Sequence, residues 1–227
     1  MEHSLQSNPS ADVFRDLTSD QRAQLREHVR DEPYPAGHLF FEPGDQGDRL
    51  LIVREGRVRL YTLAPEGRAL TLFVLEPSAF FGEMALVHRP HDCFAEALTD
   101  CTVGELPREE LRRVLGDNAA FALRVVDVMS QRLRALEQKL ADIAFKSVPQ
   151  RLAGLLLTLA EEQFQHAVGA TPPAITRYTH LQLAEMIGAY RETVTKAIGE
   201  FREAGMIKVE DDVIYLTDMQ RLRVTAG

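Results

Sequence analysis

The chain has 227 residues, of which 45% are hydrophobic and 26% are charged, a composition typical of a globular protein that buries a core without disulfides. Its formal net charge of −8 excludes nucleic-acid binders that depend on overall basicity, so any such binding must come from a local surface. The two cysteines, Cys93 and Cys101, cannot supply a four-thiolate metal cluster, and no apolar run reaches the ~18 residues of a membrane span. We therefore expect a soluble, cytoplasmic protein with no metal site.

Residues 12–117 are expected to form a first domain that begins with a short helix and continues as β-structure. The helix is indicated by spaced apolar residues at Phe14, Leu17, Leu25 and Val29. Short apolar runs then recur at 39–41, 50–53, 58–63, 70–75 and 101–106. Such closely spaced runs predict a β-sandwich of the jelly-roll type.

Two glycine-containing segments of this region are expected to close hairpins. They are Glu55-Gly56 and Pro65-Glu66-Gly67, and glycine suits them because it tolerates the positive φ of tight turns. Between them, the run at 58–63 alternates apolar and polar side chains, which predicts a strand with one solvated face.

A long helix is expected within residues 118–146. Apolar or small residues recur there at alternating steps of four and three, over three heptads. The pattern favours a seam between two copies of the helix, and hence a homodimer. The expected interface residues are Val126, Met129, Leu133, Leu136, Leu140 and Ile143. The alternative is a helix that packs this side on its own domain.

Residues 147–227 are expected to form a second domain, starting where Ser147-Val148-Pro149 breaks the long helix. A helix follows at 150–164 and a loop at 166–173. Thr179 is a candidate N-cap for a helix that runs to Ile187. Gly188 then supplies a tight turn, which predicts a helix-turn-helix.

The second helix of this motif is expected to run from Tyr190 or Arg191 to Glu203, with Gly205 as its C-terminal cap. The first residues of such a helix can enter the major groove, where Arg bonds guanine and Glu accepts from cytosine. The expected DNA-binding residues are Thr179, Arg191, Glu192, Thr193, Thr195 and Lys196. The alternative is that they form an ordinary solvated helix face.

Two short apolar runs, 206–209 and 213–216, flank an acidic turn and predict a hairpin, which makes the motif a winged helix-turn-helix. The fold class is therefore α+β: an N-terminal jelly-roll β-sandwich, a long dimerisation helix and a C-terminal winged helix-turn-helix.

This order of elements resembles the CRP/FNR superfamily of bacterial transcription regulators over roughly residues 12–220. The segments that carry the resemblance are Tyr34-Pro35-Ala36-Gly37, Gly44-Asp45, Leu51-Ile52-Val53, Phe81-Gly82-Glu83-Met84-Ala85-Leu86 and Arg191-Glu192-Thr193-Val194. The resemblance implies a homodimer on double-stranded DNA, with a palindrome of TGTGA-like half-sites read by Arg191, Glu192 and Lys196. It also implies RNA polymerase as a partner, through a surface near 163–173. Lys196 departs from the Arg of the cyclic-AMP-binding prototype and lacks its planar two-point contact.

The first domain resembles the cyclic-nucleotide-binding fold of that superfamily, and Gly82 and Glu83 match its ribose-binding pair. The Arg-Ser pair that holds the cyclic phosphate falls instead on Cys93 and Phe94, counting forward without gaps. Because burying a phosphate without a cation costs several kcal/mol, we expect a vestigial or altered pocket, no cofactor, and DNA binding that does not need cyclic AMP.

A few residues of the chain permit other functions. The spacing His88-x-x-His91-x-Cys93 could bind a metal or haem, but three such residues in one loop more often form a polar connection. No nucleophile–base pair or phosphate loop indicates an enzyme. The alternatives are a regulator gated by another effector (a cyclic nucleotide, haem and gas, or redox), and a ligand-sensing module that docks proteins through its winged domain.

Overall fold

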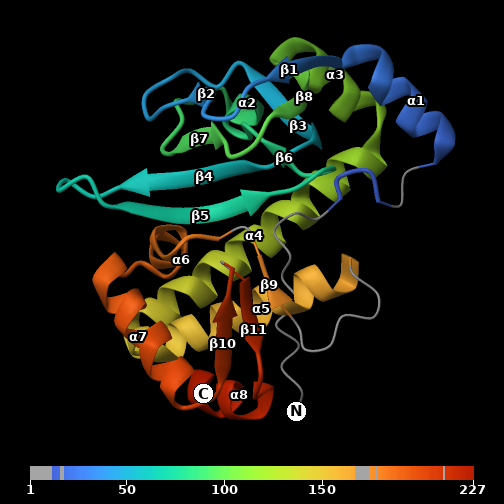
Figure 1. Cartoon of the computed structure of the whole chain (residues 1–227). Helices are drawn as coiled ribbons and strands as arrows, with labels where there is room; N and C mark the ends of the chain where they lie inside the picture. Colours follow the sequence, from blue (N-terminus) through green and yellow to red (C-terminus); the bar gives the residue numbers. More distant parts are fainter. Residues whose placement is uncertain (1–11, 16–17, 167–173, 177, 212) are drawn as a thin grey trace. The chain divides into compact units, whose positions relative to one another are not determined.

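A computed structural model gives the fold of most of the chain (Figure 1). The described residues are 12–15, 18–166, 174–176, 178–211 and 213–227. They form the expected α+β architecture in two compact units, one made of residues in 12–62 and 71–136, the other of residues in 63–70 and 137–227. No helix within the described residues has the length and apolarity that a membrane crossing requires.

The first unit contains two four-stranded sheets (Figure 1). One sheet has the order β1-β8-β3-β6, with bounds Arg30–Tyr34, Cys101–Pro107, Arg49–Glu55 and Phe80–Phe81. The other has the order β2-β7-β4-β5, with bounds Leu39–Phe41, Phe94–Ala97, Val58–Leu63 and Ala69–Leu75. The expected runs are therefore strands, and the sequence pattern missed β1, β6 and β7.

The turn at Gly56 corrects one expectation. We expected Glu55-Gly56 to close a hairpin, but β3 and β4 belong to different sheets, so the chain crosses between sheets here. Gly56 has φ +80°, and a Cβ at this position would lie 2.3 Å from the carbonyl oxygen of Asp100. The glycine is required by this close approach as well as by its conformation.

The hairpin expectation is confirmed for the segment at 65–67. Strands β4 and β5 are hydrogen-bonded neighbours, and the amide of Ala64 donates to the carbonyl of Arg68 across the turn. The expected alternation also holds, since Val58 and Leu60 of β4 are buried.

Apolar side chains from both sheets and from the helices around them fill the first unit. Phe80 and Phe81 are fully buried, each in a different cluster, because successive residues of a strand point to opposite faces. The helices are α1 (Ser19–His28), α2 (Met84–Val87) and α3 (Arg108–Asp117).

Helix α4 (Ala119–Phe145) has two apolar stripes with different surroundings. Its N-terminus is capped by the side chain of Asn118, which accepts from the amide of Phe121. One stripe packs in the core of the first unit and contains Phe121, Val125 and Val128, and the buried Arg132 lies on the same helix. The other is exposed and contains Val126, Leu133, Leu140 and Ile143.

Only part of the seam expected on α4 is exposed to solvent. Met129 and Leu136 are half-buried and pack against the two clusters of the first unit. The heptad pattern therefore combines residues that support the roll with residues that are exposed, and the sequence could not separate the two.

The second unit holds α5 (Val148–His166), α6 (His180–Ile187), α7 (Arg191–Glu203) and α8 (Met219–Ala226). Its sheet has the order β10-β11-β9, with bounds Ile207–Glu210, Val213–Leu216 and Ala174–Ile175. The expected hairpin is present, while β9 and α8 were not expected. Helix α5 starts two residues earlier than we expected, because Ser147 caps it through Gln150 and proline fits a first helical turn.

Candidate nucleic-acid interface and effector pocket

The helix-turn-helix is built by local signals that the sequence already contains. Thr179 caps α6 with a complete capping box, in which its hydroxyl accepts from the amide of Gln182 and the Gln182 side chain accepts from the amide of Thr179. Gly188 ends α6 in the left-handed region, at φ +65°. Helix α7 then begins at Arg191, as expected, and ends at Glu203 with Gly205 at φ +71°.

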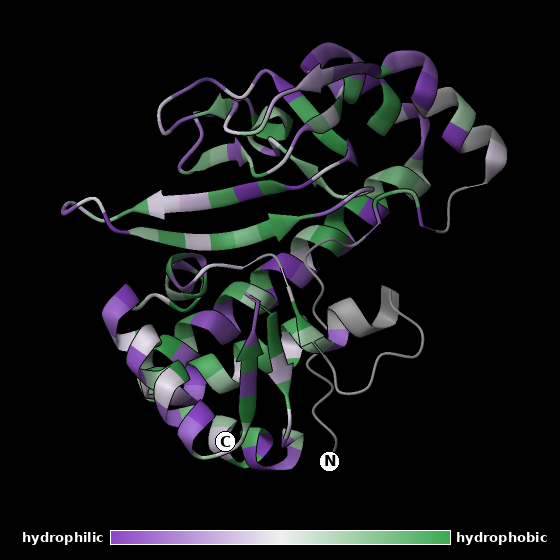
Figure 2. Ribbon diagram, viewed as in Figure 1, coloured by the Kyte–Doolittle hydropathy of each residue, from purple (hydrophilic) through white to green (hydrophobic). Residues whose placement is uncertain are grey.

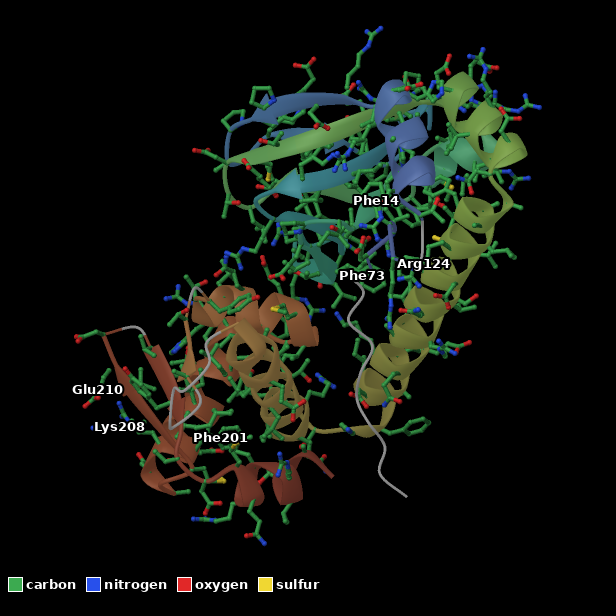
Figure 3. All side chains as sticks on the ribbon, turned by 90° about the vertical axis from the view of Figure 1, so that its right-hand side faces the viewer. Phe14, Phe73, Arg124, Phe201, Lys208 and Glu210 are labelled. Carbon is green, nitrogen blue, oxygen red and sulfur yellow. The ribbon has the colours of Figure 1, made fainter. Side chains whose placement is uncertain are left out.

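Helix α7 is divided sharply between a buried and an exposed side. Val194, Ala197, Ile198 and Phe201 enter the core of the second unit, and Phe201 is labelled in Figure 3. All five DNA-binding residues expected on this helix are exposed: Arg191, Glu192, Thr193, Thr195 and Lys196. Hydrophilic colour accordingly dominates much of α7 in Figure 2. Buried anchors hold the helix while its first two turns present polar groups to solvent.

Two of these polar side chains already have partners within the protein. Lys196 Nζ lies 3.9 Å from Glu200 Oε1, a weak exposed pair one turn apart. Thr195 Oγ1 lies 3.1 Å from His180 Nδ1, across the two helices of the motif. His180 was not among the expected DNA-binding residues, and only its place next to the cap Thr179 could have drawn attention to it.

The wing carries a charged pair on β10. Lys208 Nζ lies 2.6 Å from Glu210 Oε1, and Figure 3 labels both residues. The hydrogen bond to Glu210 raises the pKa of Lys208. Both side chains are exposed, so salt screens this pair and it adds little stability.

The expected effector-pocket residues lie in the first unit. Gly82 adopts φ +77°, and a Cβ there would lie 2.7 Å from the carbonyl oxygen of Arg49. Glu83 follows at the N-terminus of the short helix α2. Gly82 therefore has a backbone reason to be glycine that involves no ligand.

Cys93 and Phe94 occupy the positions of the phosphate-binding pair. Neither side chain carries a charge there. Phe94 stacks on Tyr61 with ring centres 5.0 Å apart and an interplanar angle of 14°. Burial raises the pKa of the Cys93 thiol to about 11, and the nearby Glu83 carboxylate contributes to this rise. The thiol is thus protonated at neutral pH and supplies neither a cation nor a reactive thiolate.

The structure places a buried cation in this region that the sequence did not indicate. Arg132 of α4 is 4% exposed, and its guanidinium donates to the carbonyl oxygen of Phe80. It lies 4.8 Å from the ring centre of Phe80 and 5.7 Å from that of Phe73. Burial lowers the pKa of Arg132, whereas the charge of Glu83 raises it. Arg132 lies outside the seam residues that the sequence indicated, and no pattern in the sequence marks it as buried.

The guanidinium of Arg132 keeps one donor without a partner. Its Nε is buried and makes no hydrogen bond within the described part of the chain. The guanidinium lies within the electrostatic reach of both Glu83 and Cys93. The cyclic phosphate of a nucleotide needs an available cation, and the cation present here is 4% exposed, lies beside two aromatic rings and donates to one carbonyl.

The candidate metal ligands face different partners. His91 is buried and stacks on Phe41 with ring centres 3.6 Å apart, whereas His88 Nδ1 lies 3.3 Å from the carbonyl oxygen of Gly47. Among the described residues, no group of three His, Cys, Asp or Glu side chains is placed to hold a metal ion.

Comparison with known proteins gives two family models in the expected order. Residues 31–118 match a cyclic nucleotide-binding domain, and residues 150–225 match a Crp-like helix-turn-helix domain.

Similar proteins extend along nearly the whole chain. The CRP-like cAMP-activated global transcriptional regulator of Mycobacterium tuberculosis is 32% identical over 213 residues, which is 93% of this chain and 95% of that protein. Transcriptional regulator SdrP of Thermus thermophilus is 36% identical over 205 residues, 89% of this chain and 96% of that one. The crystal structure of a CRP/FNR-family regulator from Thermus thermophilus superposes with a TM-score of 0.68 at 34% identity, covering 87% of this chain and 98% of that one. Since the fold, the order of the domains and these relatives agree, the chain belongs to the CRP/FNR family of DNA-binding transcription regulators, which are not enzymes.

Proposed function

We propose that the protein is a homodimeric, cytoplasmic regulator that recognises a palindrome of TGTGA-like half-sites without needing cyclic AMP. The observation that carries the proposal is the division of α7, whose apolar side is buried while Arg191 and Glu192 are exposed at its start. In a helix-turn-helix, the first residues of the second helix reach the base edges of the major groove. Arg191 suits guanine and Glu192 suits cytosine, which are both found in such half-sites.

The exposed stripe of α4 supports the homodimer. Val126, Leu133 and Leu140 are 60%, 59% and 68% exposed, which is costly for a helix that meets no partner. They follow each other at intervals of seven residues, the repeat that two helices share in a coiled coil. A second copy of the same helix would cover them, and dimers of helix-turn-helix proteins bind half-sites about one helical turn of DNA apart.

The surroundings of Glu83 support independence from cyclic AMP. Cys93 and Phe94 bring no positive charge, and the guanidinium of Arg132 is already bonded to the carbonyl of Phe80. The relative from Mycobacterium tuberculosis is named as cAMP-activated, so the family itself does not decide the matter. We infer from the residues of this pocket that the cyclic phosphate is not bound.

The proposed organisation divides the chain into a β-roll at 12–117, a dimerisation helix and hinge at 118–146, and a winged helix-turn-helix at 147–227. RNA polymerase is proposed as a further partner on the family resemblance. The surface that would contact it, near 163–173, falls mostly outside the described residues.

Substitutions in α7 test the proposed DNA recognition. Arg191→Ala and Glu192→Ala should each weaken the affinity for the specific DNA site by about tenfold or more, because each deletes a base contact. A mobility-shift titration measures this affinity. The matched control is Arg202→Ala, an exposed arginine in the last turn of the same helix. Unchanged affinity of both α7 variants, or an equal loss in Arg202→Ala, would count against the proposal.

Calorimetry tests the effector claim separately. Titration of the full chain with cyclic AMP should give no heat of binding at micromolar concentrations. Saturable binding in that range, accompanied by tighter operator binding, would overturn the claim while leaving DNA recognition intact.

A further inference from the structure

His180 and Thr195 connect the two helices of the helix-turn-helix motif through their side chains. His180 is the first residue of α6, directly after the capping threonine, and its Nδ1 lies 3.1 Å from the Oγ1 of Thr195. Thr195 lies one helical turn after Arg191 on α7, so the two residues share the face that carries the expected base-reading groups. The Thr195 side chain is exposed, which leaves its hydroxyl accessible from solvent.

The contact changes what the hydroxyl can offer to DNA. A free threonine hydroxyl has one hydrogen to donate and lone pairs to accept, and it rotates to suit either kind of partner. Base edges in the major groove are of both kinds: adenine N6 and cytosine N4 donate, whereas thymine O4 and guanine O6 accept. A freely rotating hydroxyl therefore discriminates poorly among the bases.

An imidazole nitrogen that accepts the hydroxyl hydrogen removes this ambiguity. If Nδ1 is unprotonated, it takes the hydroxyl hydrogen, and Thr195 presents only lone pairs to the groove. If Nδ1 is protonated, it donates to one lone pair of Oγ1, and the hydroxyl keeps its hydrogen and a second lone pair. The polarity of the hydroxyl is therefore fixed by the tautomer that carries its hydrogen on Nε2.

We propose that His180 is a positioning residue whose Nδ1 accepts the hydroxyl hydrogen of Thr195, so that Thr195 presents only lone pairs and prefers a donor-bearing base at one position of each half-site. The inference rests on the proposed function, because it requires α7 to lie in the major groove. His180 acts through Thr195 and needs no contact with a base itself.

The chain contains a control on the same helix. Arg202 is exposed in the last turn of α7 and is not among the expected base-reading residues. Arg202→Ala therefore changes an exposed polar side chain of α7 that lies outside the proposed base-reading turns.

The experiment measures binding of the full chain to a library in which every position of one selected half-site is varied in turn. The wild type should show one position at which donor-bearing and acceptor-bearing bases differ by about tenfold. His180→Ala should reduce that ratio to about twofold or less while other positions stay unchanged. Thr195→Val should also flatten it, and the double variant should match Thr195→Val alone, because the histidine has no other route to the base.

Conservative variants separate positioning from folding. Thr195→Ser keeps the hydroxyl and should retain the preference, and Arg202→Ala should leave this position unaffected. Thermal unfolding should show that His180→Ala remains folded. If it does not, His180→Phe, which keeps an aromatic ring but has no ring nitrogen to bond Thr195, takes its place in the same assay.

The outcomes separate this inference from the function on which it rests. A wild type that selects no half-site would refute the proposed function and the inference together. A wild type that selects a half-site, with His180→Ala keeping the full base ratio at every position, would refute the role of His180 alone. Additive effects of His180→Ala and Thr195→Val on that ratio would have the same meaning.

Discussion

The guanidinium of Arg132 donates to the carbonyl oxygen of Phe80 and lies 4.8 Å from the ring centre of the same residue. The arginine thus joins α4 to β6, which directly precedes Gly82 and Glu83. A guanidinium with this position and burial is part of the core of the first unit, although nothing in the sequence separates it from the exposed arginines nearby.

Replacing Arg132 should destabilise the protein. Arg132→Met keeps an unbranched chain among the rings of Phe73 and Phe80 but leaves the Phe80 carbonyl without its donor, at a cost of about 1–3 kcal/mol in the free energy of unfolding. Urea denaturation measures this value. Arg134→Met, at an exposed position of the same helix, should change it by less than about 0.5 kcal/mol. Equal effects of the two substitutions would show that the buried contact contributes no stability.

Gly82 should be intolerant of any side chain. Its φ of +77° strains an L-residue, and a Cβ would lie 2.7 Å from the Arg49 carbonyl, so Gly82→Ala should cost more than about 2 kcal/mol of unfolding free energy. Gly67→Ala separates the two causes, because Gly67 has a similar φ of +82° with open space around its Cβ position. It should cost only about 1 kcal/mol. A smaller loss for Gly82→Ala than for Gly67→Ala would argue against the close backbone approach.

The sequence predicted what depends on local signals. Thr179, Gly188 and Gly205 delimit the helices of the helix-turn-helix through capping and positive φ, and the apolar runs located five strands of the first unit and the two strands of the wing hairpin. Pairing between distant segments was not accessible in this way. Gly56 reads as a hairpin glycine, yet its neighbour is Asp100, which lies more than forty residues away.

The candidate site shows the same limit. The exposed side of α7 follows from helical periodicity alone, so Arg191 and Glu192 could be selected from the sequence. The role of Arg132 depends on which side of α4 faces the roll, and the contact between His180 and Thr195 depends on how two helices cross. Both are tertiary relationships, which composition and spacing do not encode.

Stability should fall in mild acid because of His91. Burial beside the ring of Phe41 lowers the pKa of His91 below its usual 6.5, while Glu83, Asp45, Asp48 and Asp92 raise it in part. The unfolded chain therefore binds a proton at a higher pH than the folded chain does. This contribution to stability is fully present above about pH 6.5 and is lost as pH falls below that value.

Denaturation in urea at about pH 7.5, 6.5 and 5.5 measures how the free energy of unfolding depends on pH. These values lie above, at and below the usual pKa of histidine. His91→Phe keeps a ring on Phe41 and removes the titrating group, so its unfolding free energy should decline less over the same interval. A steeper decline of the unfolding free energy in the variant would contradict the proposed role of His91.

The exposed stripe of α4 should hold two protomers together. Leu133→Glu places like charges opposite each other in the proposed seam and should convert a dimer into a monomer in analytical ultracentrifugation. Operator affinity should then fall by about 10²-fold or more, because one protomer binds one half-site. Leu123→Glu is the control, since Leu123 is 70% exposed but lies out of phase with the repeat. Monomeric wild type, or dissociation caused equally by both substitutions, would contradict the proposed interface.

Recognition of a palindrome without cyclic AMP is tested by selection from random double-stranded oligonucleotides, carried out with the purified wild-type chain in the presence and absence of the nucleotide. We expect the same palindrome of TGTGA-like half-sites, centred about one helical turn apart, to be enriched in both selections. Enrichment of no palindrome would contradict recognition by two α7 helices, and enrichment only with the nucleotide would contradict the independence inferred from Cys93, Phe94 and Arg132.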